Sequence, residues 1–232
     1  MNTDLETWLQ DKFAAMGEAL GRTGATSGFR IGPPLAEWEA TYFGRGLDEN
    51  LFRVNERGEI ESDLVRTNEP DSAMHPYRIF STEPTRVLRE NICQLATAAR
   101  LIFERGWLAR HVFLEPGRPE HHSNADSFDL LVRSPIGKIF VWVEVRRSAV
   151  ELEKLIADLR ACARRGPHAQ EDCGFPQNHP RHEFCVANQP SCLWAVAPDG
   201  ELVLAVNSNG PTLALEPLSA LPPRSLFELG KI

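Results

Sequence analysis

Two short runs of mostly apolar residues flank the Pro135-Ile136-Gly137 turn: Phe128-Asp129-Leu130-Leu131-Val132 before it and Ile139-Phe140-Val141-Trp142-Val143-Glu144-Val145 after it. Both runs are short, apolar and rich in β-branched and aromatic residues, which predicts two neighbouring antiparallel strands. The second run is almost wholly apolar, so we expect a central strand that is covered on both faces. These two strands decide the fold.

The flanking sequence adds helices and further strands around this pair. Ser148 begins a helix in the manner of an N-cap, and Gly106 and Gly166 stand where helices end. The pattern predicts helices at 85–105 and 149–165, a strand at 109–114 and a hairpin of strands at 193–197 and 201–206. This order predicts an α/β fold, a mixed sheet flanked by helices, over about residues 84–206.

The two ends of the chain read differently from this core. Residues 1–72 read as an acidic, mainly helical N-terminal region, with helices at 3–20 and 35–43, a hairpin within 51–61 and a linker at 66–76. Residues 207–232 carry four prolines and are predicted to be a mostly extended or irregular tail packed on the core.

Composition narrows the class of protein. The chain has 232 residues, of which 42% are hydrophobic, and no run approaches the roughly 20 apolar residues of a membrane span. The acidic start is unlike a signal peptide. Five cysteines favour a reducing, cytoplasmic location over a disulfide scaffold. We therefore expect no membrane partner.

Charge is distributed unevenly along the chain. Residues 1–72 hold 14 acidic and 7 basic side chains, which accounts for the whole net charge of −7. Residues 146–165 hold six basic and three acidic side chains. An acidic protein lacks a strong nonspecific attraction to nucleic acid, so we expect selective recognition or delivery by a partner. The acidic N-terminal region would then dock a protein partner or shield the basic segment.

Two carboxylates stand out because each lies in or beside an apolar strand. A buried carboxylate is costly unless it is paired or holds a metal. The turn between the strands brings Asp129 opposite residue 143 or 144, so Asp129 and Glu144 should converge. Two converging carboxylates suit Mg²⁺. Arg146 follows Glu144 by two residues and should share its face, and Glu90 in the preceding helix is a further candidate.

The spacing of these residues resembles the motif of the PD-(D/E)xK nuclease superfamily: Asp129, a gap of 14 residues, and then Glu144-Val145-Arg146-Arg147-Ser148 directly before a helix. The resemblance covers about residues 84–206. It implies a restriction-endonuclease-like α-β-β-β-α-β core and a metal-dependent endonuclease that hydrolyses phosphodiester bonds, with DNA the favoured substrate. By this resemblance Asp129 and Glu144 would bind Mg²⁺ or Mn²⁺, and Glu90 would be an accessory metal ligand.

One departure leaves the activity open. The superfamily's usual lysine is Arg146 here, and arginine does not release its proton near neutral pH. The site stays active if metal-bound water suffices while Arg146 stabilises phosphate charge, or if Lys154 reaches it from the next helix. Otherwise the protein is a degenerate module that only binds nucleic acid or protein. The candidate catalytic residues are Asp129, Glu144, Arg146 and Lys154.

Further candidates complete the sequence-based expectations. Arg147, Arg160, Arg164 and Arg165 are candidates for nucleic-acid binding, and a homodimer is possible. His121 and His122 form either a phosphate contact or a solvated pair. A zinc site would use Cys173, His179, His182 and Cys185, with Cys162 and Cys192 as extra candidates. The alternative is a loop with buried thiols and surface imidazoles.

Overall fold

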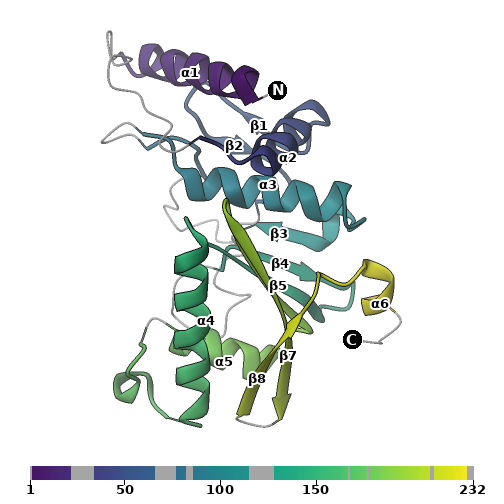
Figure 1. The fold of residues 1–232 in the computed structure, drawn as a ribbon. Helices are drawn as coiled ribbons and strands as arrows, with labels where there is room; N and C mark the ends of the chain where they lie inside the picture. Colours follow the sequence, from purple (N-terminus) through teal and green to yellow (C-terminus); the bar gives the residue numbers. More distant parts are fainter. Residues whose placement is uncertain are drawn as a thin grey trace.

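A six-stranded mixed sheet is the centre of the computed structural model, which describes residues 2–21, 34–65, 77–81, 86–114, 128–166, 168–176, 178–209 and 212–228. Its strands lie in chain order (Figure 1), and only β5 and β6 are parallel neighbours. They are β3 (Val112–Leu114), β4 (Leu130–Arg133), β5 (Ile139–Val145), β6 (Cys192–Ala197), β7 (Gly200–Asn209) and β8 (Thr212–Leu218). The α/β prediction is therefore confirmed. The predicted linker at 66–76 and the two histidines 121 and 122 lie outside the described residues.

Strand β5 is buried along its whole length, as its apolar sequence predicted. Val141, Val143 and Val145 belong to the apolar cluster that contains α3 (Arg89–Phe103). Trp142 points to the other face, into the cluster formed with α4 (Ala149–Arg164) and α5 (His179–Asn188). The alternation of side chains along the strand thus fills both layers of the core.

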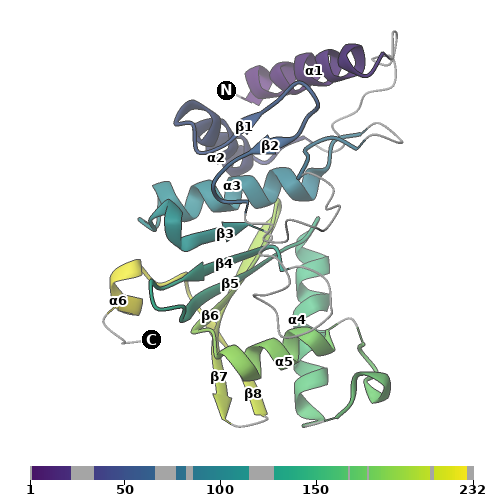
Figure 2. The ribbon, with the colours of Figure 1, turned by 180° about the vertical axis from the view of Figure 1, so that it is seen from behind.

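The N-terminal region contains α1 (Asn2–Ala19), α2 (Glu37–Asp48) and the short antiparallel strands β1 (Arg53–Val54) and β2 (Ile60–Glu61). Figure 2 shows these elements stacked on α3, on the side away from β4 and β5. Phe13, Phe43 and Phe52 lie in the same apolar cluster as α3 and the sheet. An ion pair of 2.7 Å between Glu39 and Arg89 also joins α2 to α3.

The C-terminal tail is more regular than its prolines suggested. Residues 212–218 form β8 at the edge of the sheet, which agrees with the predicted extended conformation and adds a regular strand that the prolines did not suggest. Pro217 is tolerated because an edge strand needs hydrogen bonds on one side only. The short helix α6 (Arg224–Glu228) follows. Its Phe227 packs against Trp107 and Phe140, so the tail does pack on the core.

Two predicted boundaries also shift. Helix α3 begins at Arg89 rather than 85, and residues 109–111 form a 3₁₀ turn that shortens the predicted strand to β3. Among the described residues, no helix combines the length and the apolar character needed to cross a membrane.

Candidate functional site

Asp129 and Glu144, here called the acidic pair, lie at the same end of neighbouring strands. Leu130 pairs with Val143 and Leu131 with Trp142, so the register continues to place Asp129 opposite Glu144. The backbone N–H of Val145 donates to Asp129 Oδ2 over 2.6 Å. The predicted convergence of the two carboxylates therefore follows from strand pairing, and both residues are buried.

The guanidinium of Arg146 lies between the two carboxylates. Its Nη2 donates to Glu144 Oε2 at 2.6 Å, and its Nη1 donates to Asp129 Oδ2 at 3.3 Å. The side chain is 20% exposed, so it forms the outer boundary of the site. One delocalised cation is thus shared by both members of the acidic pair.

Glu144 has two further partners, and its side chain is only 1% exposed. The indole N–H of Trp142 donates to Oε1 at 2.9 Å, and Arg181 Nε from α5 lies 3.1 Å from Oε2. Burial by itself would raise the pKa of Glu144, but the guanidinium groups of Arg181 and Arg146 outweigh it and lower that pKa. Glu144 is therefore held as a carboxylate.

Asp129 is held from the opposite layer of the fold. Gln94 Nε2 of α3 donates to Asp129 Oδ1 at 2.6 Å, and Gln94 Oε1 accepts from the hydroxyl of Tyr77. Burial, and then the charge of Glu144, raise the pKa of Asp129 well above its ordinary value. Two adjacent carboxylates with opposite pKa shifts are a frequent property of functional sites.

Sequence reasoning did not single out Gln94, Tyr77 or Arg181. Gln94 carried the one usable signal, because it is a polar residue within the run of buried residues on α3. Arg181 and Tyr77 lie far from the acidic pair in the sequence, and only the packing of α3 and α5 brings them to it.

Glu90 reaches the edge of the site as an ion-pair partner. Its Oε1 lies 3.9 Å from Arg146 Nη1, and its Oε2 lies 3.9 Å from Arg147 Nε. The Arg147 side chain is 69% exposed. The three carboxylates and the two adjacent arginines therefore form one continuous cluster at this end of the sheet.

A pocket of 290 Å³ opens beside Arg146 and is here called the basic pocket. Its lining residues are Arg146, Glu151, Lys154, Leu155, Asp158, Asn178 and Arg181. The Nζ of Lys154, a candidate catalytic group, forms an ion pair with Asp158 one helical turn away, and its side chain is 73% exposed. In this arrangement Lys154 lies on the pocket rim rather than on the acidic pair.

The other arginines of the basic segment lie elsewhere. Arg160, a candidate for nucleic-acid binding, donates from Nη2 to the carbonyl oxygen of Leu215 at 2.9 Å and packs against β8. Arg164 and Arg165 are exposed at the end of α4 and do not line the basic pocket. Of the four arginines proposed from sequence, Arg147 is the one that joins the cluster beside the acidic pair, through Glu90.

The predicted zinc ligands separate in the structure. Cys173 and His179 lie close together, whereas Cys185 is fully buried in the apolar cluster between the sheet and α4. The ring of His182 is 6.3 Å from those of His168 and His179, measured between centroids. Cys162 and His168 take the two remaining places beside Cys173 and His179.

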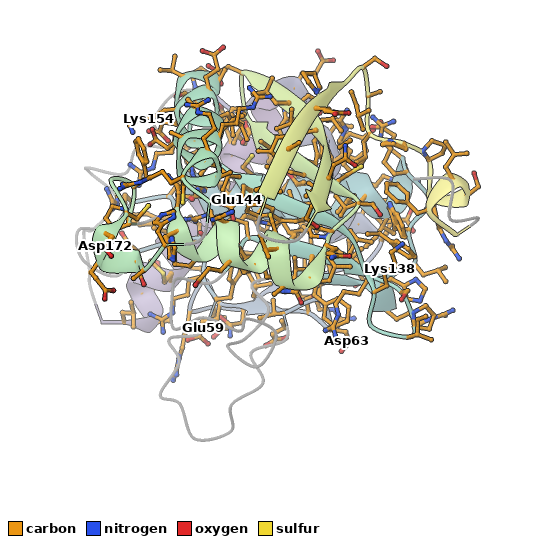
Figure 3. All side chains as sticks on the ribbon, turned by 90° about the horizontal axis from the view of Figure 1, so that it is seen from below. Glu59, Asp63, Lys138, Glu144, Lys154 and Asp172 are labelled. Atoms are coloured by element: carbon orange, nitrogen blue, oxygen red, sulfur yellow. The ribbon has the colours of Figure 1, made fainter. Side chains whose placement is uncertain are left out.

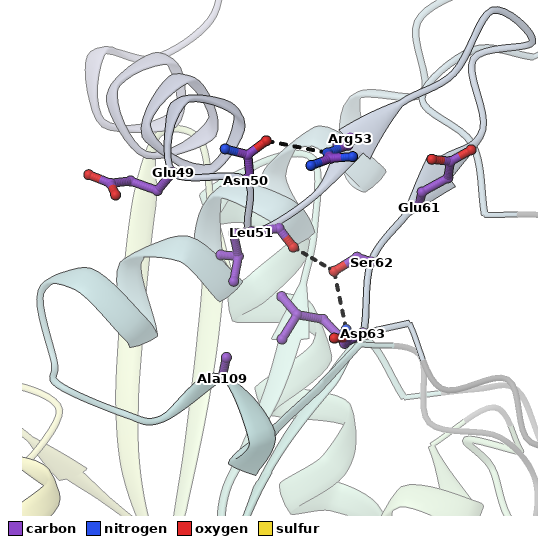
Figure 4. A pocket seen from close by; sticks show the side chains of 9 residues that line it. Glu49, Asn50, Leu51, Arg53, Glu61, Ser62, Asp63 and Ala109 are labelled. Atoms are coloured by element: carbon purple, nitrogen blue, oxygen red, sulfur yellow. Dashed lines mark hydrogen bonds between the residues drawn. The ribbon is translucent and has the colours of Figure 1, made fainter.

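A larger pocket of 580 Å³ lies in the N-terminal region (Figure 4). Its rim carries Glu49, Glu61 and Asp63, while the Ser62 hydroxyl donates to the carbonyl oxygen of Leu51 at 2.7 Å. None of the candidate catalytic or metal-binding residues lines it. It is a separate acidic hollow, distant in sequence from the acidic pair.

The carboxylate oxygens of the acidic pair are the ligands that the expected Mg²⁺ would need. All four of these oxygens already contact a nitrogen of the protein. The nitrogens on Asp129 belong to Gln94, Val145 and Arg146, and those on Glu144 belong to Trp142, Arg146 and Arg181. Mg²⁺ demands near-octahedral oxygen ligands and retains several waters. This arrangement does not fit Mg²⁺, which could bind only after Arg146 had moved away.

No protein-family model matches this chain, and a search of curated proteins also finds no match. The geometry of the acidic pair and the basic pocket is therefore the basis for assigning a function.

Proposed function

We propose that this chain is a catalytically degenerate protein of the nuclease fold, which binds nucleic-acid phosphates without hydrolysing them. One observation carries the proposal: the Arg146 guanidinium bridges Asp129 and Glu144 where the superfamily would hold a metal. The order α3-β3-β4-β5-α4-α5-β6, with β6 parallel to β5, supports the restriction-endonuclease-like reading of the fold, with α5 as an addition to the α-β-β-β-α-β core.

The chemistry of arginine explains why hydrolysis should be lost. A guanidinium neutralises carboxylates by donating fixed N–H groups, and it stays protonated at neutral pH. It does not coordinate a water molecule and lower its pKa, as a divalent metal does. With Arg181 as a second guanidinium on Glu144, the site is electrostatically satisfied by the protein alone.

The basic pocket supplies the binding surface in this proposal. Arg146, Arg181 and the largely exposed Lys154 line it. The exposed Arg147 lies next to this lining, because its backbone N–H donates to Glu151 at 3.2 Å. Such cations contact phosphate oxygens and release counterions from the nucleic acid. We favour DNA because it is the substrate class that the resemblance implies. Binding should be modest and salt-sensitive, because Glu151 and Asp158 share the pocket.

The second candidate function is a Mg²⁺-dependent nuclease. The convergence of Asp129, Glu144 and Glu90 on one guanidinium favours it, because these are the carboxylates that the resemblance assigns to the metal. Asp129 and Glu144 would hold the ion, and Arg146 would have to leave the acidic pair and face the phosphate.

The test measures binding and cleavage on the same duplex and single-stranded DNA. We expect fluorescence anisotropy to show binding that weakens as salt rises, and no cleavage with Mg²⁺ or Mn²⁺. Lys154→Gln and Arg147→Gln should each weaken binding and reduce the salt slope by about 1 if each contacts one phosphate. Lys138→Gln is the matched control, since Lys138 lies in an exposed turn far from Lys154 (Figure 3).

Cleavage that disappears in Glu144→Ala would overturn the degenerate reading in favour of the nuclease. Equal binding by Lys154→Gln, Arg147→Gln and Lys138→Gln would remove the basic pocket as the binding surface. Arg146→Lys restores the lysine of the superfamily motif. If the arginine alone prevents hydrolysis, this variant should gain Mg²⁺-dependent cleavage.

A further inference from the structure

A second cluster of chemically reactive side chains lies where α4, the following loop and α5 meet. Cys162 is in the last turn of α4, His168 and Cys173 belong to the loop, and His179 is the first residue of α5. The four candidate ligand atoms all lie within 4.8 Å of one another. Five, four and five residues separate them in sequence, so this set comes from a single continuous segment.

The distances within the cluster match a tetrahedral zinc centre. Zn–S bonds of about 2.3 Å and Zn–N bonds of about 2.0–2.1 Å imply about 3.8 Å between sulfurs and about 3.5 Å between sulfur and nitrogen. The Sγ atoms of Cys162 and Cys173 are 3.5 Å apart. Cys162 Sγ lies 3.7 Å from His168 Nε2 and 3.8 Å from His179 Nδ1.

Hydrogen-bond and ion-pair partners orient the two histidine rings of the cluster as in a metal site. His168 Nδ1 is 2.7 Å from the carbonyl oxygen of Gly166, which places a proton on Nδ1 and leaves the Nε2 lone pair facing the cluster. His179 Nε2 lies 3.4 Å from Glu183 Oε1, so its Nδ1 faces inward. Such carbonyl and carboxylate partners are typical of metal-bound histidines.

The backbone also stabilises charge on a cluster sulfur. The N–H of Phe175 donates to Cys173 Sγ at 3.3 Å, an interaction that favours thiolate over thiol. All five cysteines of the chain lie among the described residues, and none is in a disulfide. The Cys162–Cys173 separation is far beyond the sulfur–sulfur bond length of about 2.05 Å.

We infer that Cys162, His168, Cys173 and His179 bind a structural zinc ion in a Cys₂His₂ centre. Four protein ligands close the coordination sphere, which is the arrangement of structural rather than catalytic zinc. This set replaces the one proposed from sequence, because α5 turns Cys185 into the apolar core, away from the loop.

The position of the centre gives it a definite structural task. It would fasten the end of α4 to the start of α5, across a loop that contains the 3₁₀ turn Gln170–Asp172. Arg181, two residues beyond the ligand His179, pairs with Glu144. Zinc would thereby fix the segment of α5 that closes one wall of the basic pocket.

Metal analysis of the full-length protein, purified without added metal, is the first test. We expect about one zinc per chain in the wild type and in Cys185→Ala, which removes a buried thiol that the inference leaves outside the centre. Cys173→Ser and His168→Gln should lose it. Because a ligand variant could fail to fold, the wild type is also tested directly. A chelator should lower its thermal midpoint, and added Zn²⁺ should restore it.

Cobalt distinguishes this centre from an adventitious surface ion. Co²⁺ added to the reduced, metal-free protein should produce the visible absorption of tetrahedral cobalt and a thiolate charge-transfer band, both abolished in Cys173→Ser. A wild type that holds no zinc and takes up no Co²⁺ would overturn the inference. So would equal zinc content in wild type, Cys173→Ser and His168→Gln.

Discussion

Arg146→Met tests whether a guanidinium is the cation that the acidic pair requires. The substitution keeps most of the aliphatic stem but leaves Asp129 with Gln94 and a backbone N–H, and leaves Glu144 with Trp142 and Arg181. Removing one partner of a buried ion pair costs about 3–5 kcal/mol, and the partial exposure of Arg146 favours the lower end of that range.

The expected loss is large enough to measure by equilibrium unfolding in urea. About 3 kcal/mol in a chain of this length corresponds to a fall of roughly 6–12 °C in the thermal midpoint. Arg147→Met is the matched control, because Arg147 is the next residue and its side chain is mostly solvent-exposed. This substitution should lower the unfolding free energy by less than about 0.5 kcal/mol. An Arg146→Met protein as stable as this control would refute the assignment of the guanidinium as the neutralising cation.

Acid pH should reduce the cost of Arg146→Met. The pKa of Asp129 is already raised in the folded wild type by burial and Glu144, and Arg146 lowers it. Without Arg146 the folded-state pKa rises further above the unfolded value. Stability from such a group is present at low pH and is lost as pH rises through the folded-state pKa. The difference in unfolding free energy between wild type and variant should therefore narrow as the pH falls through the folded-state pKa of Asp129 in the variant. A difference that stays constant over this acid titration would contradict this reasoning.

Three further predictions concern single sites elsewhere in the structure. Trp142→Phe removes an indole donor to a buried carboxylate and should cost about 1.5–3 kcal/mol in urea unfolding, whereas a cost under about 0.5 kcal/mol would show that this hydrogen bond is dispensable. Gly46→Ala would place a Cβ 2.3 Å from the ring of Phe52 and should destabilise by about 1–3 kcal/mol; an unchanged thermal midpoint would mean that the ring moves freely. Hydrogen bonding from Asn55 helps lower the pKa of Glu59, so its stabilisation is present above the unfolded pKa and is lost as pH falls through the folded-state pKa. The small deficit of Glu59→Gln at pH 7, under about 1 kcal/mol, should thus shrink as the pH falls through the folded-state pKa of Glu59, and a deficit that stays constant over this acid titration would contradict the assignment.

The acidic pair could be located from sequence because all its determinants are local. A tight turn at residues 135–137 sets the two flanking strands side by side, and side chains alternate along each. A register shift between Val132 and Arg133 then brings Asp129 opposite Glu144 rather than residue 143. A carboxylate in such an apolar strand is conspicuous, since it is costly there without a partner. The same local signals predicted the cap at Ser148, whose hydroxyl accepts from the N–H of Glu151 at 3.3 Å.

The partners of that pair could not be assigned in the same way. Candidates for the basic groups all lay within residues 146–165, but the helix directs Arg160 toward β8, while Arg181 reaches Glu144 from α5. Gln94 likewise reaches Asp129 from a helix more than thirty residues earlier. Spacing in sequence does not encode which helix packs on which face of the sheet.

The cysteines and histidines show the same division. Sequence alone identified a Cys/His-rich segment that contains Cys173 and His179 and named Cys162 as an extra candidate, because composition is visible without a fold. That Cys162 and His168, rather than His182 and Cys185, stand beside Cys173 and His179 depends on how α4 ends and where α5 begins. Local patterning therefore determined the strands, the acidic pair and the place of Arg146 on the face of Glu144. Long-range packing alone decided that Arg181 joins Arg146 on Glu144, and that Cys162 and His168 complete the second cluster.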